Sequence, residues 1–223
     1  NGGANPDAAL IKSTLLNTAE DLGNPGPDFR YGWGRINARQ AYEGISTNKY
    51  IQGTISQGGS NNHTISVTAG VSALRIMTYW TDFDGSTSAA LALVNDLNMV
   101  VTDPNSTVFN PWVLDPTPNA TALNAPAVQG VDNINNMEQV TISDPATGTY
   151  SIDIDGFAVP QGPQNYYVVY YFVMDGVTVT YPIGGEGISG GTIVRWDASE
   201  GTTDFDLEYT LDDGGSWSPI GSA

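Results

Sequence analysis

The pattern of apolar and polar positions along the 223-residue chain changes near residue 50. Before that point, apolar residues recur every three or four positions, which is typical of an amphipathic helix. The sequence Asn5-Pro6-Asp7 offers an N-cap, a proline at the first helical position and an acid in the first turn, and Gly23 and Pro25 end the run. The apolar positions of this first helix are Leu10, Ile11, Leu15, Leu16, Ala19 and Leu22. A second short helix is predicted after its cap, Asn37.

From about Ile51 onward, apolar and polar residues alternate, which is typical of half-buried β-strands. Strands are expected at 64–67, 74–80, 93–101, 138–142, 150–154 and 166–172. Turn clusters rich in Gly, Pro, Asn and Asp separate these strands, and this order of short strands predicts a β-sandwich of jelly-roll type. The stretch 109–136 is long, Pro- and Asn-rich and unpatterned; loops of that size inside a domain are usually functional or held by a metal.

The last part of the chain restarts the strand pattern. Strands are expected at 177–182, 192–196 and 205–209, and the residues 210–217 fit an Asp-box hairpin with Trp217 packed beneath it. An immunoglobulin-like sandwich needs roughly 100 residues, so this part is expected to be a partial module. The predicted organisation is therefore mainly β: a helical segment, 1–44, a β-sandwich, 45–176, and a partial immunoglobulin-like module, 177–223.

The charge is strongly negative and unevenly placed. The chain has 24 acidic and 7 basic residues, one His, no Cys and a formal charge of −17. This charge disfavours binding to nucleic acid or to an anionic membrane surface, and no apolar run approaches the length of a membrane span. Without Cys, disulfides and thiolate metal sites are excluded. The helical segment is nearly neutral, with 5 acids and 4 bases, so the excess of acids belongs to the two β modules.

Carboxylate and amide side chains are the candidate metal ligands of the predicted sandwich. They follow or begin predicted strands, and the candidate ligands are Asp82, Asp84, Asp96, Asp132 and Glu138. Acids and amides without bases are the ligands that Ca²⁺ prefers, and a divalent ion removes the repulsion between clustered carboxylates. Two alternatives remain open: a solvated acidic rim with amides capping turns, and a pair of carboxylates that hydrolyses glycosides.

The sequence gives little support to catalysis by a serine nucleophile or by zinc. His63 enters a strand after a turn, and no Gly-x-Ser-x-Gly motif accompanies it, so neither a Ser-His-Asp triad nor a zinc site is predicted. The aromatic run 166–172 suits either sheet and core packing or an exposed sugar-binding surface; alternation in a strand turns half of it toward the core.

Two groups of motifs resemble a known family. The stretch Asn5 to Ala19, followed by Tyr31-Gly32-Trp33-Gly34-Arg35-Ile36-Asn37-Ala38, resembles the end of a subtilisin-like serine protease catalytic domain. The later motifs are similar to the C-terminal jelly-roll domain of large bacterial subtilases, which is related in architecture to the proprotein-convertase P domain. These motifs are Tyr79-Trp80-Thr81-Asp82, Leu93-Val94-Asn95-Asp96-Leu97, Asn135-Asn136-Met137-Glu138-Gln139-Val140 and Val159-Pro160-Gln161-Gly162-Pro163-Gln164. The tail is similar to fibronectin-III or immunoglobulin-like modules behind secreted bacterial enzymes.

The resemblance implies a secreted bacterial parent protein that hydrolyses peptide bonds, and a sandwich that binds calcium and stabilises the protease. The family's catalytic residues have no counterpart in this chain, so this part itself is expected to be inactive. Asn98 stands where the family usually has a second Asp, which would weaken a metal site there. A stand-alone carbohydrate- or surface-binding module is the alternative. The apolar helical segment needs a cover, which the missing catalytic domain or a dimer would supply.

Overall fold

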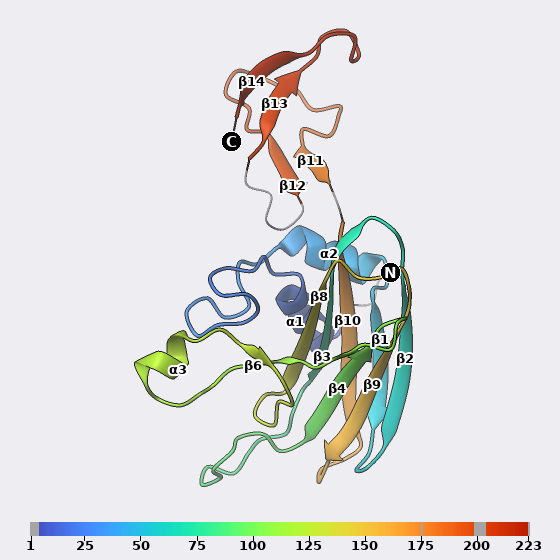
Figure 1. The fold of residues 1–223 in the computed structure, drawn as a ribbon, viewed down its shortest axis with the longest axis vertical. Helices are drawn as coiled ribbons and strands as arrows, with labels where there is room; N and C mark the ends of the chain where they lie inside the picture. The colour runs from blue at the N-terminus through green and yellow to red at the C-terminus, as the bar shows by residue number, and fades with distance from the viewer. Residues whose placement is uncertain (1–4, 175, 199–203, 223) are drawn as a thin grey trace. The chain divides into compact units, whose positions relative to one another are not determined.

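The computed structural model describes residues 5–174, 176–198 and 204–222 and divides into two compact units, Asn1–Phe172 and Val173–Ala223. The first unit contains the helical segment and the sandwich (Figure 1), and the second contains two β-hairpins. The structure is mainly β, as the alternating pattern predicted.

Two helices form the start of the first unit. Helix α1 spans Ala8–Asn17 and α2 spans Ala38–Ser46. The predicted cap of α2 is confirmed, because Asn37 Oδ1 accepts a hydrogen bond from Gln40 N at 3.1 Å. The prediction for α1 is wrong by two residues: Asp7, in an extended conformation, is its cap. The helix also ends before Leu22, because the backbone of Glu20 pairs with Arg35 in an isolated β-bridge.

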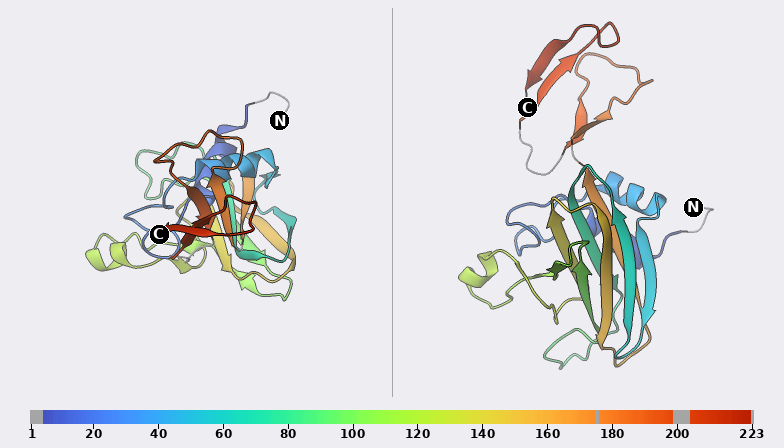
Figure 2. Two further views of the ribbon diagram at one scale, coloured as in Figure 1. Left: turned by 90° about the horizontal axis from the view of Figure 1, so that it is seen from above. Right: turned by 45° about the vertical axis from the view of Figure 1, so that its right-hand side comes forward.

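The sandwich consists of two antiparallel four-stranded sheets (Figures 1 and 2). The first sheet has the order β1-β10-β3-β8, with β1 Tyr50–Ile55, β10 Gln164–Met174, β3 Val71–Trp80 and β8 Met137–Ser143. The second has the order β2-β9-β4-β5, with β2 Ser60–Val67, β9 Gly148–Ala158, β4 Asp96–Thr102 and β5 Val108–Phe109. The sheets bury a common core that includes Leu74 and Val140 from one sheet and Met99 and Ile152 from the other.

The aromatic run in β10 follows the alternation of a strand. Tyr166 is buried, and Tyr170 and Phe172 pack against the core between the sheets. Tyr167 belongs to a second apolar cluster on the outer face of the first sheet, where Leu10 of α1 packs. The interpretation of this run as sheet and core packing is therefore confirmed.

The long unpatterned stretch forms an arm beside the sandwich. It contains β6 Trp112–Val113, α3 Ala120–Asn124 and β7 Val128–Gln129, and Figure 1 shows it extending away from the sheets. Trp112 packs against Gly26 of the link between the helices, and its indole Nε1 donates to Thr141 Oγ1 at 3.1 Å. The arm and the helical segment therefore contact each other and the first sheet.

The second unit has two hairpins: β11 Val177–Tyr181 with β12 Arg195–Ala198, and β13 Asp206–Tyr209 with β14 Ser218–Ser222. The Asp-box prediction is confirmed, since Asp212 Oδ1 accepts from Ser216 N at 2.8 Å and Oδ2 accepts from Ser216 Oγ at 2.7 Å. Trp217 lies near the turn, with its ring 3.8 Å from the position that a Cβ atom on Gly214 would take, but 57% of its surface is exposed. Among the described residues no helix has the length and apolar character needed to cross a membrane.

Candidate functional site

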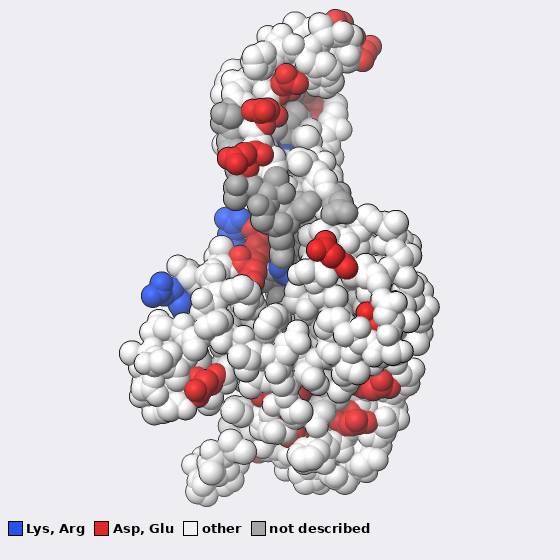
Figure 3. Space-filling view, viewed as in Figure 1, with Lys and Arg blue, Asp and Glu red and all other residues white. Residues whose placement is uncertain are grey.

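Acidic side chains occur both on the surface and inside the sandwich. On the face drawn in Figure 3 they are scattered, and basic side chains are few. Three acids of the sandwich are instead buried: Asp96, Asp132 and Glu138, with 7%, 2% and 1% of their surface exposed. The ion pairs Arg35–Glu20 and Arg39–Glu43 include none of them. Because burial of an unpaired carboxylate is costly, these three acids need an explanation.

Glu138 lies in the row of β8 that faces the second sheet. Its Oε2 accepts a hydrogen bond from Met99 N of β4 at 2.5 Å, so it joins the two sheets. Burial raises the pKa of Glu138 well above its usual range; the Met99 N–H opposes this shift, and the charges of Asp132 and Asp96 add to it. The carboxyl group therefore lies in a site that disfavours negative charge.

Asp96 opens β4 beside Glu138. Burial, followed by the charges of Asp132 and Asp82, raises the pKa of Asp96 to about 6. These electrostatic interactions link Asp82, Asp96, Asp132 and Glu138, so each of these four predicted ligands lies within electrostatic range of another. Asp84, the fifth, is exposed in the loop after β3 and takes no part in the interactions that link the other four.

The outer members of this group already have hydrogen-bond donors. Asp82 accepts from Val94 N at 2.7 Å and from Asn95 N at 2.9 Å. Asp132 Oδ1 accepts from Ile134 N at 2.8 Å and its Oδ2 accepts from the Asn135 side chain at 2.7 Å. Both carboxylates thus fix the loops in which they lie, and they contribute negative charge to the site.

Three buried side-chain oxygens in this part of the sandwich have no such partner. Among the described residues, the buried side-chain atoms Asp96 Oδ1, Asn98 Oδ1 and Glu138 Oε1 accept no hydrogen bond. A buried acceptor without a donor costs about 1–3 kcal/mol, and native proteins rarely keep several in one place. Two carboxylate oxygens and one amide oxygen are donor atoms that Ca²⁺ accepts. No three acidic, imidazole or thiol side chains converge as a metal cluster in the described ranges, so an ion here would also need amide, backbone or water oxygens.

Asn98, whose amide oxygen is the third of these atoms, was expected from the sequence only as a weaker ligand. It stands between the core residues Leu97 and Met99 of β4, so its side chain lies in the row that alternates with the core. A register shift between Asp96 and Asn98 in the pairing with β9 could not be foreseen from the sequence.

Most motifs that resemble subtilase jelly rolls meet at this end of the sandwich. Asn95 is fully buried; its side chain donates to Gln164 Oε1 at 2.7 Å and to Gln161 O at 2.8 Å. Trp80 Nε1 donates to Asn95 O at 2.9 Å, and Asn136 Nδ2 donates to Trp80 O at 2.7 Å. These residues therefore hold together the strand ends and loops that carry the buried acids.

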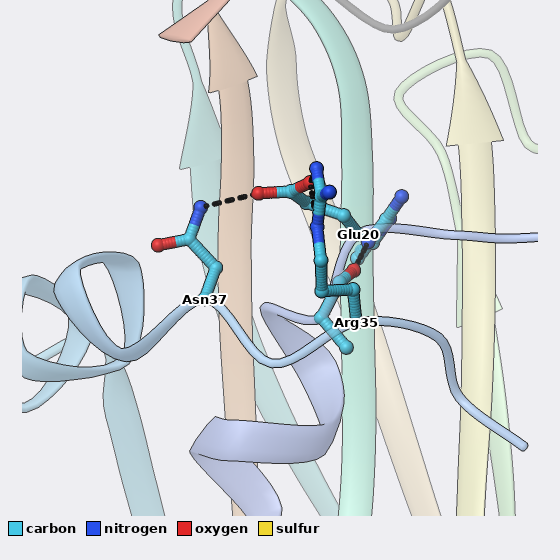
Figure 4. A network of polar contacts seen from close by, with 5 residues as sticks. Glu20, Arg35 and Asn37 are labelled. Atoms are coloured by element: carbon cyan, nitrogen blue, oxygen red, sulfur yellow. Dashed lines mark hydrogen bonds and ion pairs between the residues drawn. The ribbon is translucent and has the colours of Figure 1, made fainter. Parts of the chain in front are cut away.

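The motif in the helical segment also has a structural role. Arg35 and Glu20 form an ion pair across their β-bridge, and Asn37 Nδ2 donates to Glu20 Oε1 at 3.2 Å (Figure 4). Gly34 has a φ of +103°, and a Cβ atom there would lie 2.0 Å from Glu20 O. The glycine is thus required for the bridge that ends the first helical run.

His63, the chain's one histidine, lies in β2. Its Nε2 is 2.7 Å from the hydroxyl of Tyr166, which also accepts from Asn61 Nδ2 at 2.8 Å. Burial lowers the pKa of His63, and the charge of Asp153 opposes this. The imidazole is therefore engaged at the edge between β1 and β2.

Comparison with known proteins gives one distant relative. The chain is 26% identical, over 181 residues, to the Serine protease/ABC transporter B family protein tagA of Dictyostelium discoideum. The match covers 75% of this chain, and the chain spans about one tenth of the length of that curated relative. No family model matches the chain. The relation to a protease is therefore distant.

Solved structures add little. A periplasmic inhibitor of g-type lysozyme from Aeromonas hydrophila aligns with a TM-score of 0.26 and 16% identity over 55% of this chain and 84% of that one. A protein of Sulfurospirillum deleyianum aligns with a TM-score of 0.30 and 10% identity over 55% and 96%. Neither likeness is close enough to indicate fold or function.

Proposed function

We propose that this chain is a non-catalytic C-terminal region of a secreted subtilisin-like serine protease, and that its β-sandwich binds a calcium ion that stabilises the region. The observation that carries the calcium part is the pair of buried carboxylate oxygens, Asp96 Oδ1 and Glu138 Oε1, that accept no hydrogen bond and belong to carboxylates whose charges interact. The protease part is supported by the motifs of the helical segment and by the distant similarity to a protein named as a serine protease.

In this proposal, the central ligands are Asp96 Oδ1 and Glu138 Oε1, and Asp132 and Asp82 supply further negative charge. Bound Ca²⁺ would neutralise the repulsion among these carboxylates and satisfy the two acceptors. Because Glu138 belongs to the first sheet and Asp96 to the second, the ion would join the two sheets at this end. Asp84 is not included.

The proposed partner is the catalytic part of the same parent protein. The far side of α1 lines an open apolar groove of about 490 Å³, whose other walls include Trp33 and Ile36. Leu16 and Trp33 belong both to this groove and to the apolar cluster between α1 and the sheet, so the groove continues an existing interface. Sedimentation of the chain at high concentration tests this: a monomer is expected, and a dimer dissociated by Ile11→Asp would instead assign the groove to a second copy.

Thermal unfolding with and without Ca²⁺ tests the calcium part. An ion that binds only the folded state, present at 100 times its dissociation constant, adds about 2.7 kcal/mol, which for a chain of this size raises the melting temperature by about 5–11 °C. Asp96→Asn is expected to abolish the rise. Asp144→Asn, which removes an exposed acid just after β8, at the end of the strand away from Glu138, is expected to keep it. Equal melting temperatures with Ca²⁺ and with chelator would refute the proposal.

A further inference from the structure

The outer face of the sheet β1-β10-β3-β8 carries buried residues that a solvent-facing sheet would not tolerate. Arg75 and Gln139 are each 5% exposed, and Met77, two residues after Arg75 in β3 and opposite Gln139 in β8, is completely buried. All three lie in the rows of β3 and β8 that alternate with the core residues, and therefore on the outer face. The helical segment covers this face.

Arg75 is one of only two basic residues between 45 and 176, and its charge is buried on this face. Its Nη1 donates to the backbone carbonyl of Ala19. Burial lowers the pKa of Arg75, whereas the charges of Asp21, Tyr171 and Glu20 act to raise it. A buried cation is tolerated only with acceptors and opposite charge nearby, and residues 19–21 of the helical segment contribute both.

Asn17, the last residue of α1, makes a second set of polar contacts with the same face. Its Nδ2 lies 3.3 Å from both Arg75 O and Val169 O, and its Oδ1 accepts from Gln139 Nε2 at 2.9 Å. Asn17 is 1% exposed. One helix residue thus satisfies groups on three neighbouring strands, β8, β3 and β10.

Apolar and aromatic contacts surround these polar ones. Leu10 packs with Met77, Tyr167 and Val169 in one buried cluster. Lys12 Nζ lies 4.9 Å from the centre of the Tyr79 ring. The interface therefore combines an apolar centre with directional polar contacts that allow a single placement of the helix.

We propose that this outer face is a docking surface dedicated to the helical segment, and that the contacts of Asn17 with Gln139 and of Arg75 with Ala19 fix the orientation of that segment on the sandwich. The biological meaning of this inference rests on the proposed function. Because the helical segment is the part that resembles a protease domain, its contact with the sheet would be the interface between protease and sandwich. It also implies that a sandwich cut at residue 45 would expose a buried cation and an apolar face.

The experiment uses the full chain with a specific protease site placed between α2 and β1, at Thr47 and Asn48. After folding, the site is cleaved and the release of the N-terminal piece is followed by gel filtration. We expect the cleaved pieces to elute together. Asn17→Ala or Gln139→Ala is expected to accelerate release at least tenfold. As the control, Gln57→Ala removes an amide with two hydrogen bonds, to Phe157 O and from Val159 N, and should leave release unchanged.

If the two pieces of the cleaved chain without further substitutions separate at once, the proposed docking surface is wrong. If Asn17→Ala and Gln139→Ala release the N-terminal piece at the same rate as that chain, the proposed role of the polar contacts is wrong. If Asn17→Ala fails to fold, Asn17→Asp tests the same point, since it keeps the acceptor for Gln139 but loses the donor to Arg75 O and Val169 O. Loss of the calcium effect would leave these release rates unchanged, so a failure of the proposed calcium function is distinguishable from a failure here.

Discussion

Asp96 provides a prediction in which the sign of a pH effect separates an ion site from an ordinary acidic cluster. In chelator, the pKa of Asp96 in the folded protein is about 6, against 3.8 for an ordinary aspartate. A raised folded-state pKa contributes stability that is fully present below the unfolded value and is lost as the pH rises through the folded value. The ion-free protein is therefore expected to lose stability between pH 4 and pH 7, where most proteins gain it.

The size of this loss follows from the shift. A shift of about two units corresponds to at most about 3 kcal/mol, and solvent screening and relaxation reduce this to on the order of 1–2 kcal/mol. The isosteric change Asp96→Asn removes both the titration and the repulsion from Asp132 and Asp82. In chelator at pH 7 the Asp96→Asn protein is therefore expected to be more stable than the wild type, although it no longer responds to Ca²⁺.

Urea unfolding of both proteins at several pH values, in chelator and in Ca²⁺, measures the effect. Subtraction of the Asp96→Asn values cancels the titration of acids that do not interact with Asp96; the contribution of Glu138 remains in the difference, because the charge of Asp96 raises its pKa. With Ca²⁺ the sign is expected to invert, because the ion binds the ionised carboxylate and stability then rises with pH. Parallel curves for wild type and Asp96→Asn in chelator would refute the account of this carboxylate.

Two further predictions concern other parts of the chain. Gly34→Ala forces a positive φ on alanine and brings a Cβ atom against Glu20 O, so urea unfolding is expected to show a loss of stability of about 3 kcal/mol. Gly32→Ala is the control: its φ is also positive but the space around it is open, and the expected loss is about 1 kcal/mol. Equal losses would contradict the role of the β-bridge. Hydrogen bonds from Ser216 and Thr210 lower the pKa of Asp212 to about 2, so its support of the β13–β14 hairpin is present above pH 4 and lost as the pH falls through 2. Amide exchange in β14 is expected to accelerate in Asp212→Ala at neutral pH, and unchanged exchange would contradict it.

The fold class could be predicted from the sequence because the alternation of apolar and polar residues in a strand is a local signal. Each expected strand of the sandwich is present, and the Asn37 cap and the Asp212 turn follow from short-range side-chain chemistry. The end of α1 was not accessible, because it depends on the pairing of Glu20 with Arg35, fifteen residues away. The exposure of Trp217 likewise depends on what packs around the hairpin, which no local pattern encodes.

The acids of the candidate site could be selected from the sequence, but their arrangement could not. Asp82, Asp96, Asp132 and Glu138 come from a loop, two strands of different sheets and the end of the arm, and only the sandwich brings them together. Asp84 has the same local context as Asp82 but faces solvent. The docking of α1 was missed for a similar reason: Arg75 appears in the sequence as an ordinary polar position of a strand, and its partner is a backbone carbonyl.

The most direct test of the calcium site is terbium luminescence. The indole of Trp80 donates to the carbonyl of Asn95, the residue before Asp96, so Tb³⁺ bound at this site lies near a tryptophan that can sensitise its emission. Saturable sensitised emission, displaced by Ca²⁺, is predicted for the wild type and for the control Asp144→Asn. It is predicted to be absent in Asp96→Asn. Wild-type protein without sensitised emission, or an Asp96→Asn protein with undiminished emission, would contradict the central claim that these buried oxygens bind a cation.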